Sequence, residues 1–274
     1  MIQGCFWVSI GYIFGVLSFA ATGCTGSGKR TNNADSRFEK LVIFGDVAKN
    51  GIFDVSVEYG PDGIGWMAYS RVELPKYVST HLARSRDRGK TWTYVSTINA
   101  SQDDTIIVNG KAVSGLWRYE TPTLVYDPKD HPTRRWKLYA ERYFTLPPYK
   151  KDSTLHGEGW IEMKYARRPD GFWSKAERLF GSRASGSRID LNQLHPDLNG
   201  MKFYNELGSI ALGDTLYLSM DASFTPSGLG DWEKRKIILI ESKDHGKTWI
   251  YTGPLTDYDD ASDARYLVLT VPAW

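Results

Sequence analysis

The octapeptide Ser-Lys-Asp-His-Gly-Lys-Thr-Trp occupies residues 242–249, and a near copy, Ser-Arg-Asp-Arg-Gly-Lys-Thr-Trp, occupies residues 85–92. Both follow the pattern Ser-x-Asp-x-Gly-x-Thr-Trp. An Asp at this place accepts hydrogen bonds from the backbone N–H groups of its own turn, and Gly supplies the positive φ angle that the turn needs. Runs rich in β-branched and aromatic residues flank each copy, so each copy predicts a β-hairpin. The residues expected to hold the two turns are Asp87, Gly89, Trp92, Asp244, Gly246 and Trp249.

A third, shortened copy at residues 165–173 keeps the Asp, the Gly and the Trp. Two further strands precede each of the three hairpins, so four strands recur per unit, which is typical of the blades of a β-propeller. We therefore predict an all-β fold with about three complete four-stranded antiparallel blades and negligible helix. First strands are expected at 54–59, 120–126 and 207–212, and second strands at 65–69, 136–140 and 215–219.

Two further strands are expected outside these blades. Residues 40–44 predict a strand that precedes the first blade, and propellers often close by pairing such a strand into the last blade. Residues 265–270 begin a fourth unit. Because propellers typically need about four or more blades to close, this pattern predicts that the chain is truncated within its next blade.

The two full octapeptides resemble the Asp-box (BNR) repeats of sialidase-like propellers. The resemblance covers the hairpins directly, and the blade pattern extends it over roughly residues 40–274. It implies that Asp87 and Asp244 are structural, because the Asp-box of that family lies at the outer rim of a blade. It also implies a protein that acts on carbohydrate. Two functions stay open, a glycoside hydrolase and a non-catalytic glycan-binding surface lipoprotein on the same scaffold, because a fold does not define a function.

The N-terminal segment reads as a targeting signal. Residues 1–23 contain no charged side chain, and an almost continuous apolar run ends in Ala-Thr-Gly-Cys at residues 21–24. The small residues before Cys24 resemble a bacterial lipobox, which predicts lipidation of Cys24 and a position at the cell envelope. An ordinary cleaved signal peptide of a secreted or periplasmic protein, or an uncleaved anchor, are the alternatives. Residues 24–39 predict a flexible tether, and residues 40–274 the propeller domain.

Bulk composition excludes several classes of function. The net charge of +2 gives no electrostatic reason to expect nucleic acid as a partner. Both cysteines lie in the N-terminal segment, so the folded part is expected to have no disulfide. The five histidines show no paired metal-ligand spacing, and we expect no metal and no cofactor. The acidic run at 257–263 is either a calcium loop or, as we expect, a solvated loop. We expect the protein to be a monomer that binds carbohydrate. Its contact with a membrane is expected to be through the lipid anchor only.

Candidate catalytic residues lie where the first strand of each blade begins, because these strands deliver side chains to the central axis. The residues are Asp54, Glu120 and Glu206. Their placement resembles the five-bladed furanosidase-type glycosidases related to arabinanases and invertases, whose acids come from successive inner strands. A glycosidic bond is cleaved between two carboxyl groups, one protonated as general acid and one ionised. We expect Glu206 to be the general acid and Asp54 to be the base or nucleophile. Glu120 would raise the pKa of the acid by like-charge repulsion, or would take the place of Asp54. Alternatively, all three cap backbone amides at strand ends.

Spacing sets Asp54 apart from the other two acids. Glu120 and Glu206 each precede a hydroxyl residue by three positions, whereas Asp54 precedes Ser56 by two. Since side chains alternate between the faces of a strand, Asp54 is expected to point away unless a β-bulge corrects its register.

Further candidates surround these acids. The nearest residues that could bind a sugar and set the carboxyl pKa values apart are Arg71, Arg118, Tyr119 and Arg265. The resemblance does not extend to sialic acid as substrate, because no Arg-Ile-Pro segment is present and the arginines do not map onto the three that sialidases use. Long loops expected at 145–159 and 182–200 would either shape a sugar pocket or decorate the rim.

Overall fold

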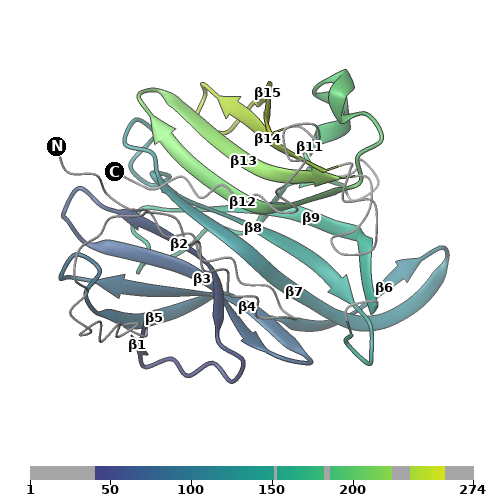
Figure 1. Cartoon of the computed structure of the whole chain (residues 1–274), viewed down its shortest axis with the longest axis horizontal. Helices are drawn as coiled ribbons and strands as arrows, with labels where there is room; N and C mark the ends of the chain where they lie inside the picture. The colour runs from purple at the N-terminus through teal and green to yellow at the C-terminus, as the bar shows by residue number, and fades with distance from the viewer. Residues whose placement is uncertain (1–40, 151–152, 182–185, 224–234, 257–274) are drawn as a thin grey trace, which may run out of the picture. The chain divides into compact units, whose positions relative to one another are not determined.

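The computed structural model describes residues 41–150, 153–181, 186–223 and 235–256, and there the chain forms three β-sheets (Figure 1). Two single turns of 3-10 helix, η3 (Leu191–Gln193) and η4 (Pro196–Leu198), are the helical elements of this part of the chain. The all-β fold class predicted from the sequence is confirmed. None of the helices in the described part has the length and apolar character needed to cross a bilayer.

Contacts divide the chain into two compact units, Met1–Val42 and Ile43–Trp274, and all three sheets belong to the second. The predicted targeting segment and the whole predicted tether, with Cys24, lie outside the described residues. So do the acidic run at 257–263, expected to be a solvated loop, and the predicted fourth unit with Arg265.

The first sheet has the strand order β1-β5-β4-β3-β2. Its strands are β1 (Ile43–Phe44), β2 (Ile52–Tyr59), β3 (Gly65–Glu73), β4 (Tyr77–Ser85) and β5 (Trp92–Asn99). Strands β2 to β5 form an antiparallel meander. The short strand β1 pairs in parallel with β5, with Ile43 opposite Trp92. The N-terminal strand therefore covers the outer edge of its own blade instead of entering a last blade.

The second sheet has the order β11-β10-β9-β8-β7-β6. Its strands are β6 (Gln102–Val108), β7 (Lys111–Tyr126), β8 (Trp136–Thr145), β9 (Thr154–Ala166), β10 (Glu177–Gly181) and β11 (Ile189–Asp190). Two features were not predicted. Strand β6 and the first half of β7 form an additional hairpin, and much of the expected loop at 145–159 is strand because β9 begins at Thr154. Within the second expected loop, the described residues contain β11 and both 3-10 turns.

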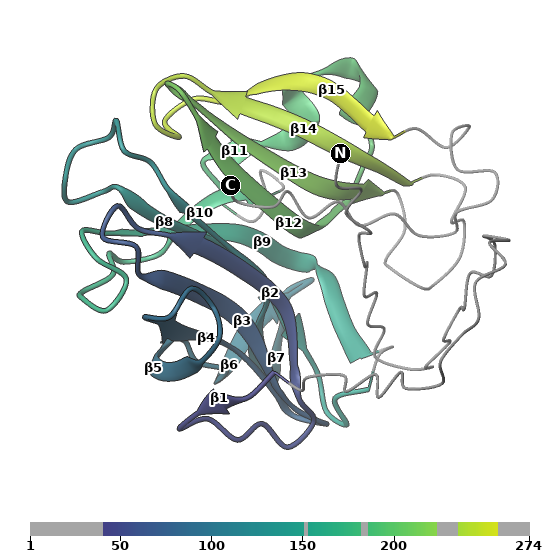
Figure 2. The ribbon, with the colours of Figure 1, turned by 60° about the vertical axis from the view of Figure 1, so that its left-hand side comes forward.

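The third sheet, β12-β13-β14-β15, is a four-stranded antiparallel meander. Its strands are β12 (Phe203–Leu212), β13 (Thr215–Ser223), β14 (Arg235–Ser242) and β15 (Ile250–Thr256). Figure 2 follows the chain from the purple first sheet through the teal second sheet to the yellow-green third sheet. The predicted first and second strands of every unit fall within β2, β7 and β12 and within β3, β8 and β13.

Three hydroxyl side chains join the first strands of the successive sheets. The Thr123 hydroxyl lies 3.4 Å from the Ser56 hydroxyl on one side and 2.8 Å from the Ser209 hydroxyl on the other. The backbone N–H of Leu124 also donates to Ser56 Oγ, at 3.0 Å. Strands β2, β7 and β12 thus meet one another while the remaining strands extend outward. This is the arrangement of neighbouring blades in a β-propeller.

Apolar side chains fill the space between neighbouring sheets. Between the first and second sheets, Trp66 and Leu82 pack with Leu124, Trp136 and Leu138. A larger core joins the second and third sheets. Burying a large apolar side chain contributes roughly 1.5–3 kcal/mol. The inner strands are consequently held at fixed positions, as a site at their ends requires.

The turn of the first octapeptide is closed by its own side chains. Asp87 accepts hydrogen bonds from the Thr91 backbone N–H at 2.9 Å and from the Thr91 hydroxyl at 2.6 Å. Gly89 has a φ of 84°, and the Trp92 indole N–H donates to the Gly89 carbonyl at 3.1 Å. The hydrogen bonds from Thr91, with one from Ser85, lower the pKa of Asp87 to about 2.

The second octapeptide repeats this turn. Asp244 accepts from the Thr248 N–H at 2.8 Å and from the Thr248 hydroxyl at 2.6 Å, and the Trp249 indole donates to the Gly246 carbonyl. Burial acts to raise the pKa of Asp244, but these hydrogen bonds outweigh it and lower the pKa to about 2. The shortened copy keeps the indole bond, from Trp173 to the Pro169 carbonyl, whereas its Asp170 pairs with Arg168.

Candidate active site

Each first strand carries a β-bulge at the same place. The register of β2 with β3 shifts between Phe53 and Ser56, and corresponding shifts follow Glu120 in β7 and Asn205 in β12. One residue in each bulge has a positive φ: Asp54 (52°), Thr121 (46°) and Glu206 (51°). Such backbone conformations of residues other than glycine cost on the order of 1–3 kcal/mol each and cluster at functional sites.

The bulges change the register inferred from the sequence. Asp54 and Glu206 occupy the same position of the bulge, where β7 has Thr121. Glu120 precedes that position by one and corresponds to Phe53 and Asn205, each the last paired residue before its bulge. The offset therefore belongs to Glu120, not to Asp54. The distance from each acid to the next hydroxyl residue does not give its register. The first paired residue after the bulge is Ser56 in β2 and Thr123 in β7, but in β12 it is Gly208, one position before Ser209.

The second strands add two carboxylates that the sequence analysis missed. Glu120 lies directly opposite Glu141 in β8, and Asn205 lies opposite Asp221 in β13. The same position of the first sheet holds Ser70. A signal for both residues exists in the sequence, because each is the single acidic residue of its second strand.

Electrostatic coupling shows that these acids converge. The pKa of Glu141 is raised well above its ordinary value, by burial and by its neighbours. The neighbours that raise it are Glu120, Glu206, Asp54 and Asp221. Burial and then the Asp54 carboxylate raise the pKa of Glu120 to about 7. Three acids at the bulges of the inner strands and one on a partner strand thus act on Glu141.

Asp54 and Glu120 differ in the groups that contact them. Burial raises the pKa of Asp54, whereas hydrogen bonds from the Ser70 hydroxyl and the Thr121 N–H favour its ionised form. The Tyr143 hydroxyl donates to Glu120 Oε2 at 2.7 Å. Glu206 is exposed, in contrast to these half-buried acids. The pKa values of Asp54, Glu120 and Glu141 are all raised, and of the three it is Asp54 whose ionised form is favoured by two hydrogen-bond donors.

Arg118 lies beside the carboxyls, but its guanidinium donates hydrogen bonds to backbone carbonyls. Its guanidinium lowers the pKa of Glu120. It is buried and donates to the backbone carbonyls of Pro75 and Lys76 in the turn between β3 and β4. Arg118 therefore ties the first two sheets together and supplies positive charge next to the acids.

Two other predicted binding residues lie away from the acids. Tyr119 is on the opposite face of β7 from Glu120, where Arg142 stacks over the rings of Trp117 and Tyr119. Arg71 is held by Asp46, with Nε 2.8 Å from Oδ1, and by Glu73 at 2.6 Å. Neither side chain is directed at the converging carboxyls.

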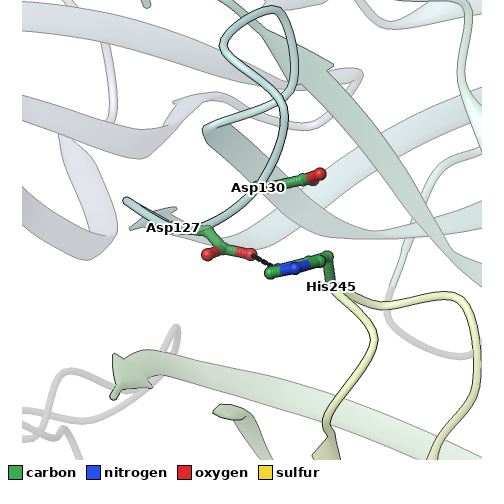
Figure 3. A group of neighbouring side chains, drawn as sticks. All are labelled: Asp127, Asp130 and His245. Carbon is green, nitrogen blue, oxygen red and sulfur yellow. Dashed lines mark hydrogen bonds and ion pairs between the residues drawn. The ribbon is translucent and has the colours of Figure 1, made fainter. Parts of the chain in front are cut away.

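A second cluster of chemically active side chains lies between the second and third sheets. Asp127, Asp130 and His245 offer ligand atoms that all lie within 4.8 Å of one another, a spacing at which they could hold a metal ion (Figure 3). His245 Nδ1 is 3.0 Å from Asp127 Oδ2. Because His245 lies 118 positions from Asp127, sequence spacing did not reveal the cluster.

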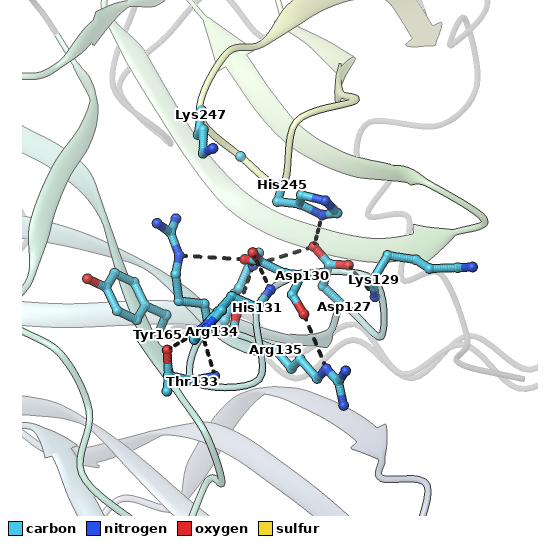
Figure 4. A network of polar contacts seen from close by, with 12 residues as sticks. Asp127, Lys129, Asp130, His131, Thr133, Arg134, Arg135, Tyr165, His245 and Lys247 are labelled. Atoms are coloured by element: carbon cyan, nitrogen blue, oxygen red, sulfur yellow. Dashed lines mark hydrogen bonds and ion pairs between the residues drawn. The ribbon is translucent and has the colours of Figure 1, made fainter.

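The charge of this cluster is already balanced by the protein. The Lys137 side chain is 1% exposed, and its ammonium contacts Asp130 Oδ2 and lies 3.4 Å from Asp127 Oδ2. Figure 4 shows the surrounding polar network, in which Arg134 also reaches Asp130. A cation would compete with this buried ammonium. The cluster therefore fits an ionic contact between blades better than a metal centre.

Comparisons with known proteins give structural similarities alone. No family model matches, and no curated protein matches by sequence. A Hadza microbial sialidase, Hz136, is 16% identical over 76% of this chain and 38% of its own, with a TM-score of 0.48. The intramolecular trans-sialidase of Ruminococcus gnavus is 14% identical over 81% of this chain and 64% of its own, also with a TM-score of 0.48. The α-L-arabinanase of Penicillium chrysogenum is 16% identical over 76% of this chain and 50% of its own, with a TM-score of 0.39.

The chain thus spans between about a third and two thirds of the length of these proteins. The three are glycoside-processing proteins by name, and a polysaccharide lyase is also among the similar structures, at a TM-score of 0.42. At these scores the similarities carry no argument about the chemistry of this chain. The assignment of a function rests on the carboxyls themselves.

Proposed function

We propose that this protein is a glycoside hydrolase that cleaves glycosidic bonds between paired carboxyl groups. The observation that carries the proposal is the convergence of Asp54, Glu120 and Glu206 with Glu141 and Asp221. Within this group, burial and the Asp54 carboxylate raise the pKa of Glu120 to about 7. A carboxyl with such a pKa is about half protonated at neutral pH and can donate a proton to a leaving oxygen. Burying several acids together without a catalytic use would be costly.

Within this proposal Glu120 is the general acid. Asp54 is the ionised partner, because the Ser70 hydroxyl and the Thr121 N–H donate to its carboxylate. Glu206, on the third inner strand, is the competing candidate for the acid and is the more accessible of the two. Burial and the Asp54 carboxylate keep the proton on Glu120. Asp54 acts as nucleophile in a retaining reaction or as base in an inverting one.

The test is hydrolysis of a panel of aryl furanosides and pyranosides by the complete expressed protein and its variants. Glu120→Gln and Asp54→Asn should each lower kcat by orders of magnitude, and NMR of the released sugar should show whether its configuration is retained or inverted. Asp214→Asn, an exposed carboxylate in the turn between β12 and β13, is the matched control. Full activity of both site variants would refute the assignment. Absence of hydrolysis together with saturable glycan binding would support the non-catalytic glycan-binding alternative.

We also propose that the protein is exported and held at the bacterial cell envelope by lipid on Cys24, with a secreted or periplasmic protein as the alternative. The support is the charge-free segment 1–23 that ends in small residues before Cys24. Each buried methylene of an acyl chain contributes about 0.8 kcal/mol to membrane binding. Cys24→Ala should therefore release the protein from the membrane fraction or leave it unprocessed. Unchanged mass and fractionation would exclude lipidation at this residue.

A further inference from the structure

A pocket of about 240 Å³ lies between the first and second sheets, away from the carboxyl cluster. The β2–β3, β7–β8 and β9–β10 turns surround it. The residues that matter for its chemistry are Asp62, Tyr126, Arg135, Trp136, Arg167 and Arg168. Tyr126 is the last residue of β7 and Glu120 lies six residues earlier. At about 3.3 Å per residue, the pocket is roughly 20 Å from the candidate active site.

Aromatic rings form one wall of the pocket. Trp66 and Trp136 meet edge to face with ring centroids 6.4 Å apart, and Tyr126 lies 5.1 Å from Trp136 at 49°. Trp66 and Trp136 are 1% and 4% exposed, so the core holds both indoles rigidly. Tyr126 is half-buried and offers the ring that a ligand can contact. A preformed apolar wall with a few polar groups is typical of a small-molecule site.

Three arginines and one aspartate are the charged residues that line the pocket. Arg168 is paired with Asp170, its Nε 3.0 Å from Oδ1. Arg135 uses Nε to donate to the Asp130 carbonyl at 3.2 Å, which leaves its two terminal nitrogens for another acceptor. Arg167 is exposed and makes no hydrogen bond or ion pair with any residue that the structure describes. Two guanidinium groups therefore face the pocket without a carboxylate partner.

The planar guanidinium group binds carboxylate and sulfate through paired hydrogen bonds. We propose that this pocket is a second binding site, for a sugar unit that carries a carboxylate or sulfate group. The anionic group is bound by Arg135 and Arg167, and the apolar face of the sugar ring lies against Tyr126. The choice of a sugar rests on the proposed function, whereas the choice of an anion follows from the two arginines.

The site has the opposite charge from the candidate active site. The ionised carboxyls of the candidate active site repel an acidic sugar, and three arginines against one aspartate attract it here. An acidic glycan would thus be held by its charged units at this pocket while a neutral unit reaches the carboxyls. The pocket would select chains of mixed charge.

The experiment measures binding of D-glucuronate to the complete protein by calorimetry and by the fluorescence of the pocket tryptophans. D-glucose and sodium sulfate are the comparison ligands. Glucuronate should bind saturably and more tightly than either, and Arg167→Gln and Arg135→Gln should each weaken it about tenfold. Arg86→Gln removes an exposed arginine from the turn of the first octapeptide and should leave binding unchanged.

Four results would overturn the proposal. They are no glucuronate binding at millimolar concentration, glucose binding as tightly as glucuronate, sulfate binding as tightly as glucuronate (an adventitious ion only), and loss of binding in Glu120→Gln but not in Arg167→Gln. The last would place the ligand at the carboxyls. The glycoside panel is a separate readout. If the protein binds glucuronate through Arg167 but hydrolyses no glycoside, the proposed glycoside hydrolase function is refuted and the second binding site is supported.

Discussion

Glu120 and Glu141 face each other directly across β7 and β8, and the pKa values of both are raised. Neither residue is paired with a cation at hydrogen-bond distance in the described part of the chain, and Tyr143 is the hydroxyl donor to Glu120. Two opposed acids on neighbouring strands destabilise a sheet unless at least one holds a proton. The first prediction follows from this pair.

We expect Glu120→Gln to make the protein less sensitive to alkaline pH. The pKa of Glu120 rises from an ordinary 4.5 to about 7 on folding, chiefly through burial. The unfolded chain therefore loses this proton first, so the stability present below pH 4.5 declines as the pH rises through about 7. Urea denaturation at pH 5 and pH 8 should show a smaller decline for the variant, by on the order of 1–3 kcal/mol. Equal declines for both proteins would contradict the buried acid pair.

The same titration should appear in activity. If Glu120 is the proton donor, kcat/KM falls above pH 7, where its carboxyl ionises. The pH–rate profile of Glu120→Gln, measured with an activated aryl glycoside that needs no proton donor, should lack this alkaline limb. A limb that persists in Glu120→Gln and disappears in Glu206→Gln would assign the acid to Glu206 instead.

Glu206→Gln should lower kcat against a responsive aryl glycoside by orders of magnitude if Glu206 belongs to the catalytic group. Its melting temperature should barely change, because the side chain is exposed and glutamine keeps its shape. The deciding measurement is the kcat of the variant compared with its melting temperature. Undiminished kcat would remove Glu206 from the site, and a large drop in melting temperature would show that it is structural.

Asp244→Ala should destabilise the third sheet, because Asp244 accepts the Thr248 N–H and hydroxyl hydrogen bonds that close the turn. Lost hydrogen bonds worth about 1 kcal/mol lower the melting temperature by roughly 2–4 °C in a protein of this size. Since the pKa of Asp244 is lowered to about 2, the contribution is present above pH 3.8 and is lost as the pH falls through about 2. Lys243→Ala, an exposed neighbour, serves as the control for calorimetry.

Lys137→Met should be severely destabilising. It removes the buried ammonium between Asp127 and Asp130 and leaves two buried carboxylates to repel each other. Removing one partner of a buried ion pair costs about 3–5 kcal/mol. Urea denaturation should show this loss, while Lys90→Met at an exposed position should be neutral. Near-neutral behaviour of Lys137→Met, or its rescue by added Zn²⁺, would support a metal centre at Asp127, Asp130 and His245.

Local patterns in the chain predicted the all-β class, the three four-stranded units and the turns at Asp87 and Asp244. These features follow from interactions within about ten residues, since each turn closes on its own Thr and Trp and each strand shows its own apolar pattern. The same reasoning placed Asp54, Glu120 and Glu206 at the starts of the inner strands. Their roles stay a prediction.

The tertiary structure decided everything that depends on which strands meet. A β-bulge is a relation between two paired strands, so the shared bulge position of Asp54 and Glu206 and the offset of Glu120 required the register. Glu141 joins the acids because β8 pairs with β7. Likewise, Lys137 and His245 meet Asp127, and the arginines of two turns line one pocket, only after the sheets have packed. Long-range packing leaves no spacing pattern along the chain, which is why these sites became visible only in the folded protein.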